Sequence, residues 1–107
     1  MTEDCIFCKI VDKQIPANIE YEDDLCMIFH DINPIAKTHL LIIPKKHIAT
    51  IADLKPEDEK LVGHMVGKAR DIAKERGIDG YKLSFNVGKG GGQEVFHIHL
   101  HLISDQG

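Results

Sequence analysis

The sequence predicts an α+β fold in which one long helix covers an antiparallel sheet of about five strands. Three observations predict it: short apolar runs end at turn residues, one long segment has helical periodicity, and two alternating segments follow it near the end of the chain. The 107 residues match the length of one domain, and we expect residues 1–107 to form it.

The first expected element is a short N-terminal helix at residues 4–10, with Asp4 as its N-cap. Ile6, Phe7 and Ile10 have the spacing of one apolar face. Three strands are predicted next, at residues 19–22, 25–30 and 39–43. The third, HLLII, is nearly continuous in apolar residues, which is typical of a strand covered on both faces.

The long helix is predicted to run from Pro56 to Arg76. Pro56 fits the first helical position, and the acidic residues 57–59 suit the positive end of the helix dipole. Gly77 suits the position after the last turn. Apolar residues recur at i, i+3 and i+4 and predict one buried stripe: Leu61, Val62, Met65, Val66, Ala69, Ile72 and Ala73.

The last two strands are predicted at residues 81–87 and 95–103, joined as a hairpin by the glycine-rich turn 88–92. The second contains HIHLHLI, where histidines alternate with apolar residues. A strand points alternate side chains to opposite faces, so His97, His99 and His101 would form a row with an apolar face behind it. Successive rings would be about 6.6–6.8 Å apart, which is awkward for three ligands of one metal.

The composition limits the partners. The net charge of −4 and the lack of a basic stripe with interleaved aromatic residues argue against nucleic-acid binding. No apolar run approaches the roughly 20 residues that span a bilayer. The polar start Met1-Thr2-Glu3-Asp4 does not resemble a signal peptide, so we expect a cytoplasmic protein. Three cysteines in such a chain argue against a disulfide framework.

Two patterns leave alternatives open. Cys5 and Cys8 form a C-x-x-C pair that could hold one corner of a zinc site, with histidines completing the shell, or could be two buried thiols. The glycines of residues 88–92 could bring backbone N–H groups close to a phosphate, or could serve a turn that needs positive φ. The adjoining Gln93 and histidines favour ligand contact.

The histidine row also has several explanations. Its spacing favours unequal roles, in which one neutral imidazole attacks phosphorus while its neighbours position or structure the site. A site made only for a metal is the main rival, and three solvated surface histidines are the third explanation.

These residues fit a known pattern. HIHLHLI matches H-φ-H-φ-H-φ-φ, with φ apolar, of the histidine triad family. The resemblance covers nearly the whole chain and includes CIFCKI, FHDINP, THLLIIPKKHI, SFNVG and GGQEVFHIHLHLI. The chain is similar to the nucleotide-binding branch that contains the purine nucleoside phosphoramidases.

The resemblance implies a hydrolase that cleaves the P–N bond of nucleoside 5′-phosphoramidates and related adenylates, through a covalent nucleotidyl-histidine, and releases a nucleoside monophosphate. His99 would be the nucleophile, His101 would bind a non-bridging phosphate oxygen, and His97 would help to position the site. Asp31 would bind the ribose hydroxyls. The remaining nucleotide contacts implied are Ile6, Phe7, Phe29, His30 and Ile32 for the base, and Asn86, Gln93 and the backbone near Gly92 for the phosphate.

Similar family members hold a structural zinc ion through two cysteines and two histidines, which here are Cys5, Cys8, His47 and His97. His39 matches a further histidine that serves or supports the site. The resemblance also implies a homodimer, with sheets joined edge to edge and long helices packed together.

The sequence departs from the family pattern at two points. Glu94 stands where animal members have a serine that contacts the phosphate or the leaving group. A carboxylate would repel the phosphate, so that role is not carried over to Glu94. Strand alternation would also place Glu94 off the histidine face. The chain ends soon after the triad, and we expect the longer C-terminal tail of some relatives to be short or absent.

Two other functions stay open at this stage. One is a nucleotide-binding regulatory or scaffold protein whose catalysis is incidental. The other is a zinc-dependent hydrolase, which would need three protein ligands and an open position for water. The sequence offers enough ligands to close the zinc shell, and it does not choose between adenine and guanine nucleotides.

Overall fold

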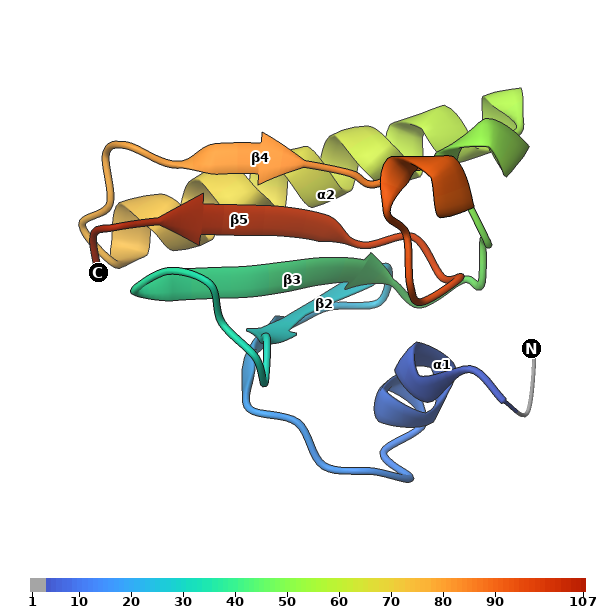
Figure 1. Cartoon of the computed structure of the whole chain (residues 1–107), viewed down its shortest axis with the longest axis horizontal. Coiled ribbons are helices and arrows are strands. Elements are labelled where there is room, and N and C mark those ends of the chain that lie inside the picture. The colour runs from blue at the N-terminus through green and yellow to red at the C-terminus, as the bar shows by residue number, and fades with distance from the viewer. Residues whose placement is uncertain (1–3) are drawn as a thin grey trace.

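The computed structural model describes residues 4–107. Residues 1–3, on which part of the expectation about the start of the chain depends, lie outside the described residues. Five strands form one antiparallel sheet in the order β1-β2-β3-β5-β4 (Figure 1). The strands are β1 (Ile19–Glu22), β2 (Cys26–His30), β3 (Thr38–Pro44), β4 (Lys82–Ser84) and β5 (Leu100–Ser104). The predicted α+β class is confirmed.

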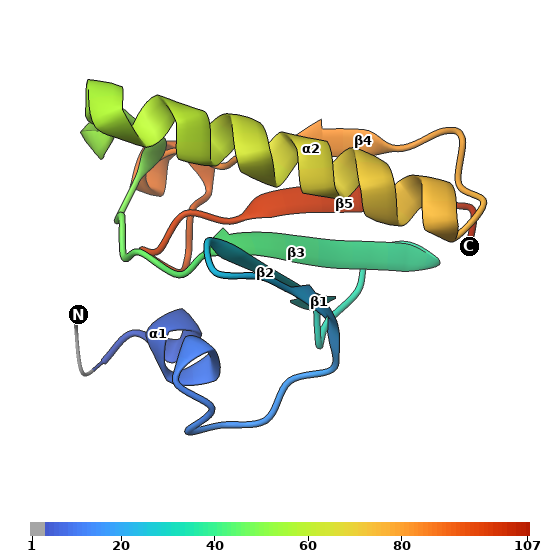
Figure 2. The same cartoon turned by 180° about the vertical axis from the view of Figure 1, so that it is seen from behind.

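The two α-helices lie on opposite faces of this sheet. α2 (Glu59–Glu75) runs along one face, and the short α1 (Ile6–Val11) packs on the other (Figures 1 and 2). Three short 3₁₀ turns complete the elements of residues 4–107: η1 (Ile51–Asp53), η2 (Pro56–Asp58) and η3 (Lys89–Gly91). Within residues 4–107, no helix combines the length and the apolar character needed to cross a membrane.

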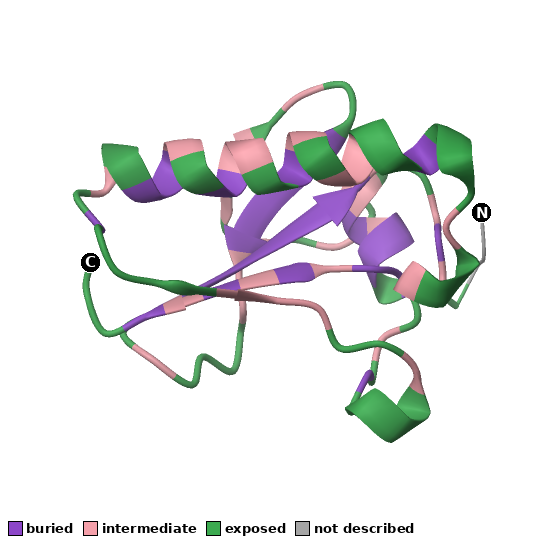
Figure 3. Cartoon of the chain, turned by 90° about the horizontal axis from the view of Figure 1, so that it is seen from above, coloured by how far each residue is buried: buried purple, intermediate pink, exposed green. Residues whose placement is uncertain are grey.

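The sheet separates two apolar clusters. Every residue of the central strand β3 is buried, as the run HLLII predicts (Figure 3). Alternate residues of β2, β3 and β5 face α2 and pack on its apolar stripe, among them Ile28, Leu40, Ile42, Leu100 and Leu102. The residues between them face α1, among them Met27, Phe29, Leu41 and Ile43. The candidate functional residues share this second face.

The ends of both helices differ from the prediction in instructive ways. Cys5, not Asp4, caps α1, because its Sγ accepts a hydrogen bond from Cys8 N at 3.3 Å. α2 begins at Glu59, since Pro56–Asp58 forms a separate 3₁₀ turn. Gly77 does end the helix, with φ of +71°. The prediction that Val66 belongs to the buried stripe is wrong, because its side chain is 40% exposed.

The last hairpin is shorter than predicted, and the three histidines do not form a row on one strand. β4 ends at Ser84, which pairs with His101, so the residues before β5 have no strand partner on that side. Ile98 N donates instead to Ile48 O at 2.8 Å. β5 therefore begins at Leu100, and only His101 of the triad lies within it. Ile98, Leu100 and Leu102 are buried behind it, as expected.

Candidate active site

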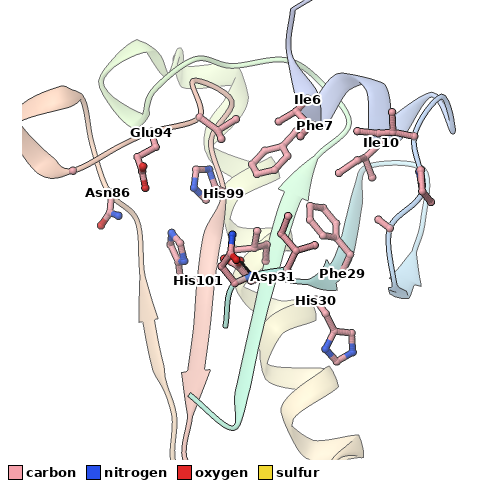
Figure 4. A pocket seen from close by; sticks show the side chains of 18 residues that line it. Ile6, Phe7, Ile10, Phe29, His30, Asp31, Asn86, Glu94, His99 and His101 are labelled. Atoms are coloured by element: carbon pink, nitrogen blue, oxygen red, sulfur yellow. Dashed lines mark hydrogen bonds between the residues drawn. The ribbon is translucent and has the colours of Figure 1, made fainter. Parts of the chain in front are cut away.

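A cavity of about 530 Å³ opens between α1, the turn after β2 and the segment that leads into β5 (Figure 4). Every nucleotide contact implied by the resemblance lines it except Gln93. The lining residues are Ile6, Phe7, Ile10, Ile15, Pro16, Ala17, Phe29, His30, Asp31, Ile32, Asn33, Leu41, Asn86, Gly92, Glu94, Val95, His99 and His101.

The geometry of the His99 ring fixes which nitrogen is reactive. Its Nδ1 lies 2.8 Å from the main-chain carbonyl of His97, which can only accept, so Nδ1 carries the proton. The lone pair is therefore on Nε2. Burial lowers the pKa of His99, which keeps the ring neutral near pH 7. Phe7 packs edge-on against it, with ring centroids 5.0 Å apart. His99 is thus a held, neutral imidazole on the cavity wall.

A chain of hydrogen bonds sets the tautomer of His101. The Ile35 N–H donates to Nδ1 of the buried His39 at 3.3 Å, so the proton of His39 is on Nε2. That Nε2–H lies 3.0 Å from Nδ1 of His101 and donates to it. His101 must then carry its own proton on Nε2, which is buried and has no hydrogen-bond partner within residues 4–107. The site presents an unused N–H donor.

Burial also lowers the pKa of His101 to about 4. The ring is therefore a neutral donor near pH 7. His99 and His101 lie side by side, with ring centroids 4.9 Å apart. One of the two neighbouring imidazoles offers a lone pair, and the other offers an N–H. This pair suits an attack on phosphorus combined with a hydrogen bond to a phosphate oxygen.

Asp31 is held by the turn that follows β2. Its Oδ1 accepts from Asn33 N at 2.8 Å, and its Oδ2 lies 3.5 Å from His39 Nε2. The carboxylate lines the cavity beside the two histidines (Figure 4). A carboxylate in this position can accept hydrogen bonds from a vicinal diol.

The opposite part of the cavity is apolar. Phe7 and Phe29 meet edge to face, with ring centroids 5.6 Å apart, and Ile6 lies beside them. His30 is tied to Glu20 by a contact of 2.8 Å, and Ile32 is 87% exposed at the rim. The resemblance did not include several lining residues: Ile10, Ile15, Pro16, Ala17, Asn33, Leu41, Glu94 and Val95. Ile10 could have been found, because it shares the predicted apolar face of Ile6 and Phe7.

Gln93 does not reach the cavity. Its side chain is buried, and its amide N–H groups donate to Ala49 O at 2.7 Å and to Val95 O at 3.0 Å. Its Oε1 accepts from Gly88 N at 2.8 Å. Gln93 thereby holds the glycine turn, in which Gly88 and Gly92 have φ of +71° and +84°, and the turn presents Gly92 to the cavity.

Glu94 lines the cavity, contrary to the expectation from strand alternation. The alternation argument fails because the chain is not extended in a ladder before Leu100. Figure 4 shows Glu94 beside Asn86, on the side of His99 away from Phe7 and Phe29.

His97 lies elsewhere. Its ring is fully buried and belongs to a cluster with Cys5, Cys8 and His47, whose four ligand atoms all lie within 4.8 Å of one another. His97 Nδ1 is 3.3 Å from Cys5 Sγ, 3.6 Å from Cys8 Sγ and 3.2 Å from His47 Nδ1. Only the main-chain carbonyl of His97 reaches toward the cavity, where it holds His99.

The cluster fits a tetrahedral metal ion. With metal–N of about 2.0–2.1 Å and metal–S of about 2.3 Å, the edges of the tetrahedron are about 3.3 Å for N···N and about 3.6 Å for S···N. His97 Nε2 donates to Pro44 O at 2.8 Å, which leaves the Nδ1 lone pair for a metal. Burial lowers the pKa of His97 to about 4, so the ring is neutral, as a ligand must be. Two thiols and two imidazoles would close the shell.

The family model described as "Scavenger mRNA decapping enzyme C-term binding" matches residues 4–107. The purine nucleoside phosphoramidase of Escherichia coli (strain K12) is 49% identical over 105 residues, which cover 96% of this chain and 88% of that protein.

Two solved structures are similar along nearly the whole chain. A HIT family hydrolase from Legionella pneumophila Philadelphia 1 is 50% identical, with a TM-score of 0.93 and coverage of 97% of this chain and 95% of the other. A Zn-bound histidine triad family protein from Mycobacterium smegmatis is 38% identical, with a TM-score of 0.85 and coverage of 96% and 76%. Fold, site and comparisons agree: the chain belongs to the histidine triad (HIT) family.

Proposed function

We propose that this enzyme hydrolyses purine nucleoside 5′-phosphoramidates and related adenylates through a covalent nucleotidyl-His99 intermediate. The observation that carries the proposal is the hydrogen bond of 2.8 Å between His99 Nδ1 and the His97 carbonyl. It leaves the Nε2 lone pair of a neutral imidazole on the wall of a nucleotide-sized cavity. The phosphoramidase activity of the Escherichia coli relative supports the choice of substrate.

The reaction would proceed in two displacements. His99 Nε2 attacks the α-phosphorus, the P–N bond breaks, and the leaving nitrogen takes the electron pair and gains a proton. Water then attacks the nucleotidyl-histidine, which restores the free imidazole and releases the nucleoside monophosphate. The unpartnered Nε2–H of His101 would donate to a non-bridging oxygen as charge develops in each step.

The rest of the cavity suits the rest of a nucleotide. Phe7, Phe29 and Ile6 provide faces and edges on which a purine can pack. The Asp31 carboxylate would accept hydrogen bonds from the ribose hydroxyls. Asn86 lies on the side of His99 away from Phe7 and Phe29 and offers a neutral donor to the phosphate (Figure 4). The backbone at Gly92 also lines the cavity and would offer another.

We further propose that the metal held by Cys5, Cys8, His47 and His97 is zinc. A closed tetrahedral shell of two thiolates and two imidazoles is typical of structural zinc and leaves no position for a reactive water. When bound, the ion would supply a cross-link between α1 and the segment before β5. The Zn-bound Mycobacterium smegmatis protein supports this choice of metal.

We infer a homodimer formed through the edge of the sheet. β4 pairs with β5 on one side only, so its other edge is available to a second copy. Three apolar side chains are exposed on these elements: Val66 on α2, and Tyr81 and Val87 on either side of β4. A second copy could cover them. Light scattering with size-exclusion chromatography should give a mass of about twice the 12.0 kDa of one chain.

Intact-protein mass spectrometry tests the mechanism. The protein is mixed with an adenosine 5′-phosphoramidate and quenched in the first seconds. A mass increase of one adenylyl group is expected in the wild type and not in His99→Ala, whose circular dichroism should match that of the wild type. Turnover by His99→Ala at the wild-type rate would exclude the proposal. Tight binding of adenosine nucleotides without any adduct or turnover would instead indicate a binding protein.

A further inference from the structure

The nucleotide cavity has an unusual balance of charge for a phosphate-binding site. No lysine or arginine occurs among its lining residues in the described chain, whereas Asp31 and Glu94 each contribute a carboxylate. The phosphate would therefore meet the neutral N–H of His101 and no fixed cation. The two carboxylates repel any negative charge that a ligand carries in addition to its phosphate, and they attract a positive charge.

The two carboxylates have different surroundings. Asp31 accepts from Asn33 N and lies beside His39, which fixes it in the turn. Glu94 is exposed, and within residues 4–107 its side chain has no hydrogen bond or ion pair. Its charge is therefore not offset by a protein cation and acts on whatever occupies that side of the cavity.

The order of residues around the cavity shows what Glu94 would face. In Figure 4, Phe7 and Phe29 lie on one side of His99, and Glu94 and Asn86 lie on the other. With the base on the aromatic side and the α-phosphate at the histidines, the group attached to phosphorus is directed toward Glu94. This is the leaving group.

A second hollow continues from this side. It has a volume of about 400 Å³ and shares Ile6, Glu94 and Val95 with the nucleotide cavity. Asp4 supplies a second carboxylate, and the described lining again contains no lysine or arginine. There is room for a side chain of several carbon atoms, and the carboxylates of Glu94 and Asp4 both line this hollow.

We infer that Glu94 is a specificity-determining residue that selects leaving amines carrying a second, positively charged group and disfavours anionic leaving groups. The inference rests on the proposed function, since it names the substrate class of that same site. The bond changes are those of the general reaction: the P–N bond breaks, and the leaving nitrogen keeps the electron pair and takes a proton from solvent. The distal cation is not altered; it contributes by lying near Glu94 and, if long enough, near Asp4.

Three adenosine 5′-phosphoramidates of matched length test this inference. Their amines are 1,4-diaminobutane, pentylamine and 5-aminopentanoate, which end in an ammonium, a methyl group and a carboxylate. The value of kcat/KM is measured for each with the wild type, with Glu94→Gln, and with Glu75→Gln as a control. Glu75 is an exposed glutamate at the end of α2, outside both cavities.

The wild type should prefer the ammonium substrate over the methyl substrate, and the methyl substrate over the carboxylate. An unscreened charge pair at about 4 Å in water corresponds to a factor of about five. The attraction of the ammonium and the repulsion of the carboxylate each contribute this factor, so at low salt the ammonium-to-carboxylate ratio should fall about 25-fold in Glu94→Gln. Glu75→Gln should keep the wild-type ratio. The wild-type preference should also weaken as salt is raised from 0.05 to 0.5 M.

Two results would overturn the inference and leave the proposed function intact. One is turnover of all three substrates by the wild type without a preference for charge. The other is a uniform change in Glu94→Gln, by which all three substrates lose the same factor and the ratio stays constant. If the wild type turns over none of the three, the proposed function itself fails, and the inference fails with it.

Discussion

His39 Nε2 lies 3.0 Å from His101 Nδ1, in a pair that joins the central strand β3 to its neighbour β5. Of these two histidines, His39 has its tautomer set directly by the backbone, because the Ile35 N–H donates to its Nδ1. The hydrogen bond from His39 in turn sets the tautomer of His101, whose Nε2–H is left without a partner within residues 4–107. His39 is therefore a positioning residue, since it acts on the substrate through its neighbour.

Replacing His39 should reduce the rate through His101. We expect His39→Leu to lower kcat about 10- to 100-fold, because His101 is no longer held with its proton on Nε2. His39→Gln keeps an N–H donor and should restore much of the loss. A merely structural role would affect both variants according to their thermal stability, so a rate that follows stability and not the donor would contradict this assignment.

Asp31 should contribute to ribose binding. A hydrogen bond to a charged group contributes about 1.5–3 kcal/mol, so Asp31→Asn should raise KM for an adenosine phosphoramidate at least tenfold. The matched control is the 2′,3′-dideoxy substrate, which offers Asp31 neither ribose hydroxyl, and for which wild type and variant should have similar KM values. An equal effect of the substitution on the KM of both substrates would show that Asp31 does not bind the ribose hydroxyls.

The metal cluster should matter for stability more than for chemistry. We expect about one zinc ion per chain by elemental analysis, and a marked loss of zinc in Cys8→Ser. The melting temperature should fall in this variant, because α1 loses its link to the segment before β5. Cys26, which is buried in the other apolar cluster, provides the control: Cys26→Ala should retain the zinc.

Chelation separates a structural metal from a reactive one. Slow removal of zinc should reduce activity only in step with the loss of stability or the loosening of α1. Full loss of activity in a chain that keeps its melting temperature and its hydrogen-exchange protection would mean that the metal takes part in the reaction.

Stability should fall as the solution becomes acidic. Burial lowers the pKa of His101 from 6.5 to about 4 in the fold, so between these values the unfolded chain binds a proton that the folded chain does not. The free energy of unfolding should therefore decrease from pH 6.5 toward pH 4, by up to about 1.4 kcal/mol per pH unit for this group. Urea unfolding at pH 7.5, 6 and 5 should show a smaller slope for His101→Asn; equal slopes would contradict the prediction.

Most of the fold follows from local patterns in the sequence. The apolar run of β3 and the periodicity of α2 depend on neighbours along the chain, and both are found where the sequence predicts them. The start of β5 does not follow in this way. HIHLHLI alternates from its first residue, but a strand needs a partner, and β4 ends at Ser84. Strand pairing depends on tertiary structure, so the alternation of apolar and polar residues along one segment does not predict where the strand begins.

The same distinction applies to the site. The carboxylate at Asp31 and the aromatic residues were placed by the family resemblance, and all line the cavity. The expectations for Gln93, from the resemblance, and for Glu94, from strand alternation, are both wrong, because the turn 88–92 sets the orientation of these side chains. The buried amide of Gln93 bonds to three backbone groups, and the chain then turns Glu94 outward to the cavity.

The hydrogen bond that orients His99 is accepted by a main-chain carbonyl, and this has an evolutionary consequence. A main-chain acceptor remains when the side chain that accompanies it is replaced, so position 97 can exchange its imidazole for another residue without removing the atom that orients the nucleophile. Metal binding thus depends on the side chain of residue 97, whereas the orientation of the nucleophile His99 depends on the main chain of residue 97. A descendant in a zinc-poor environment could lose metal binding while it keeps the orientation of His99.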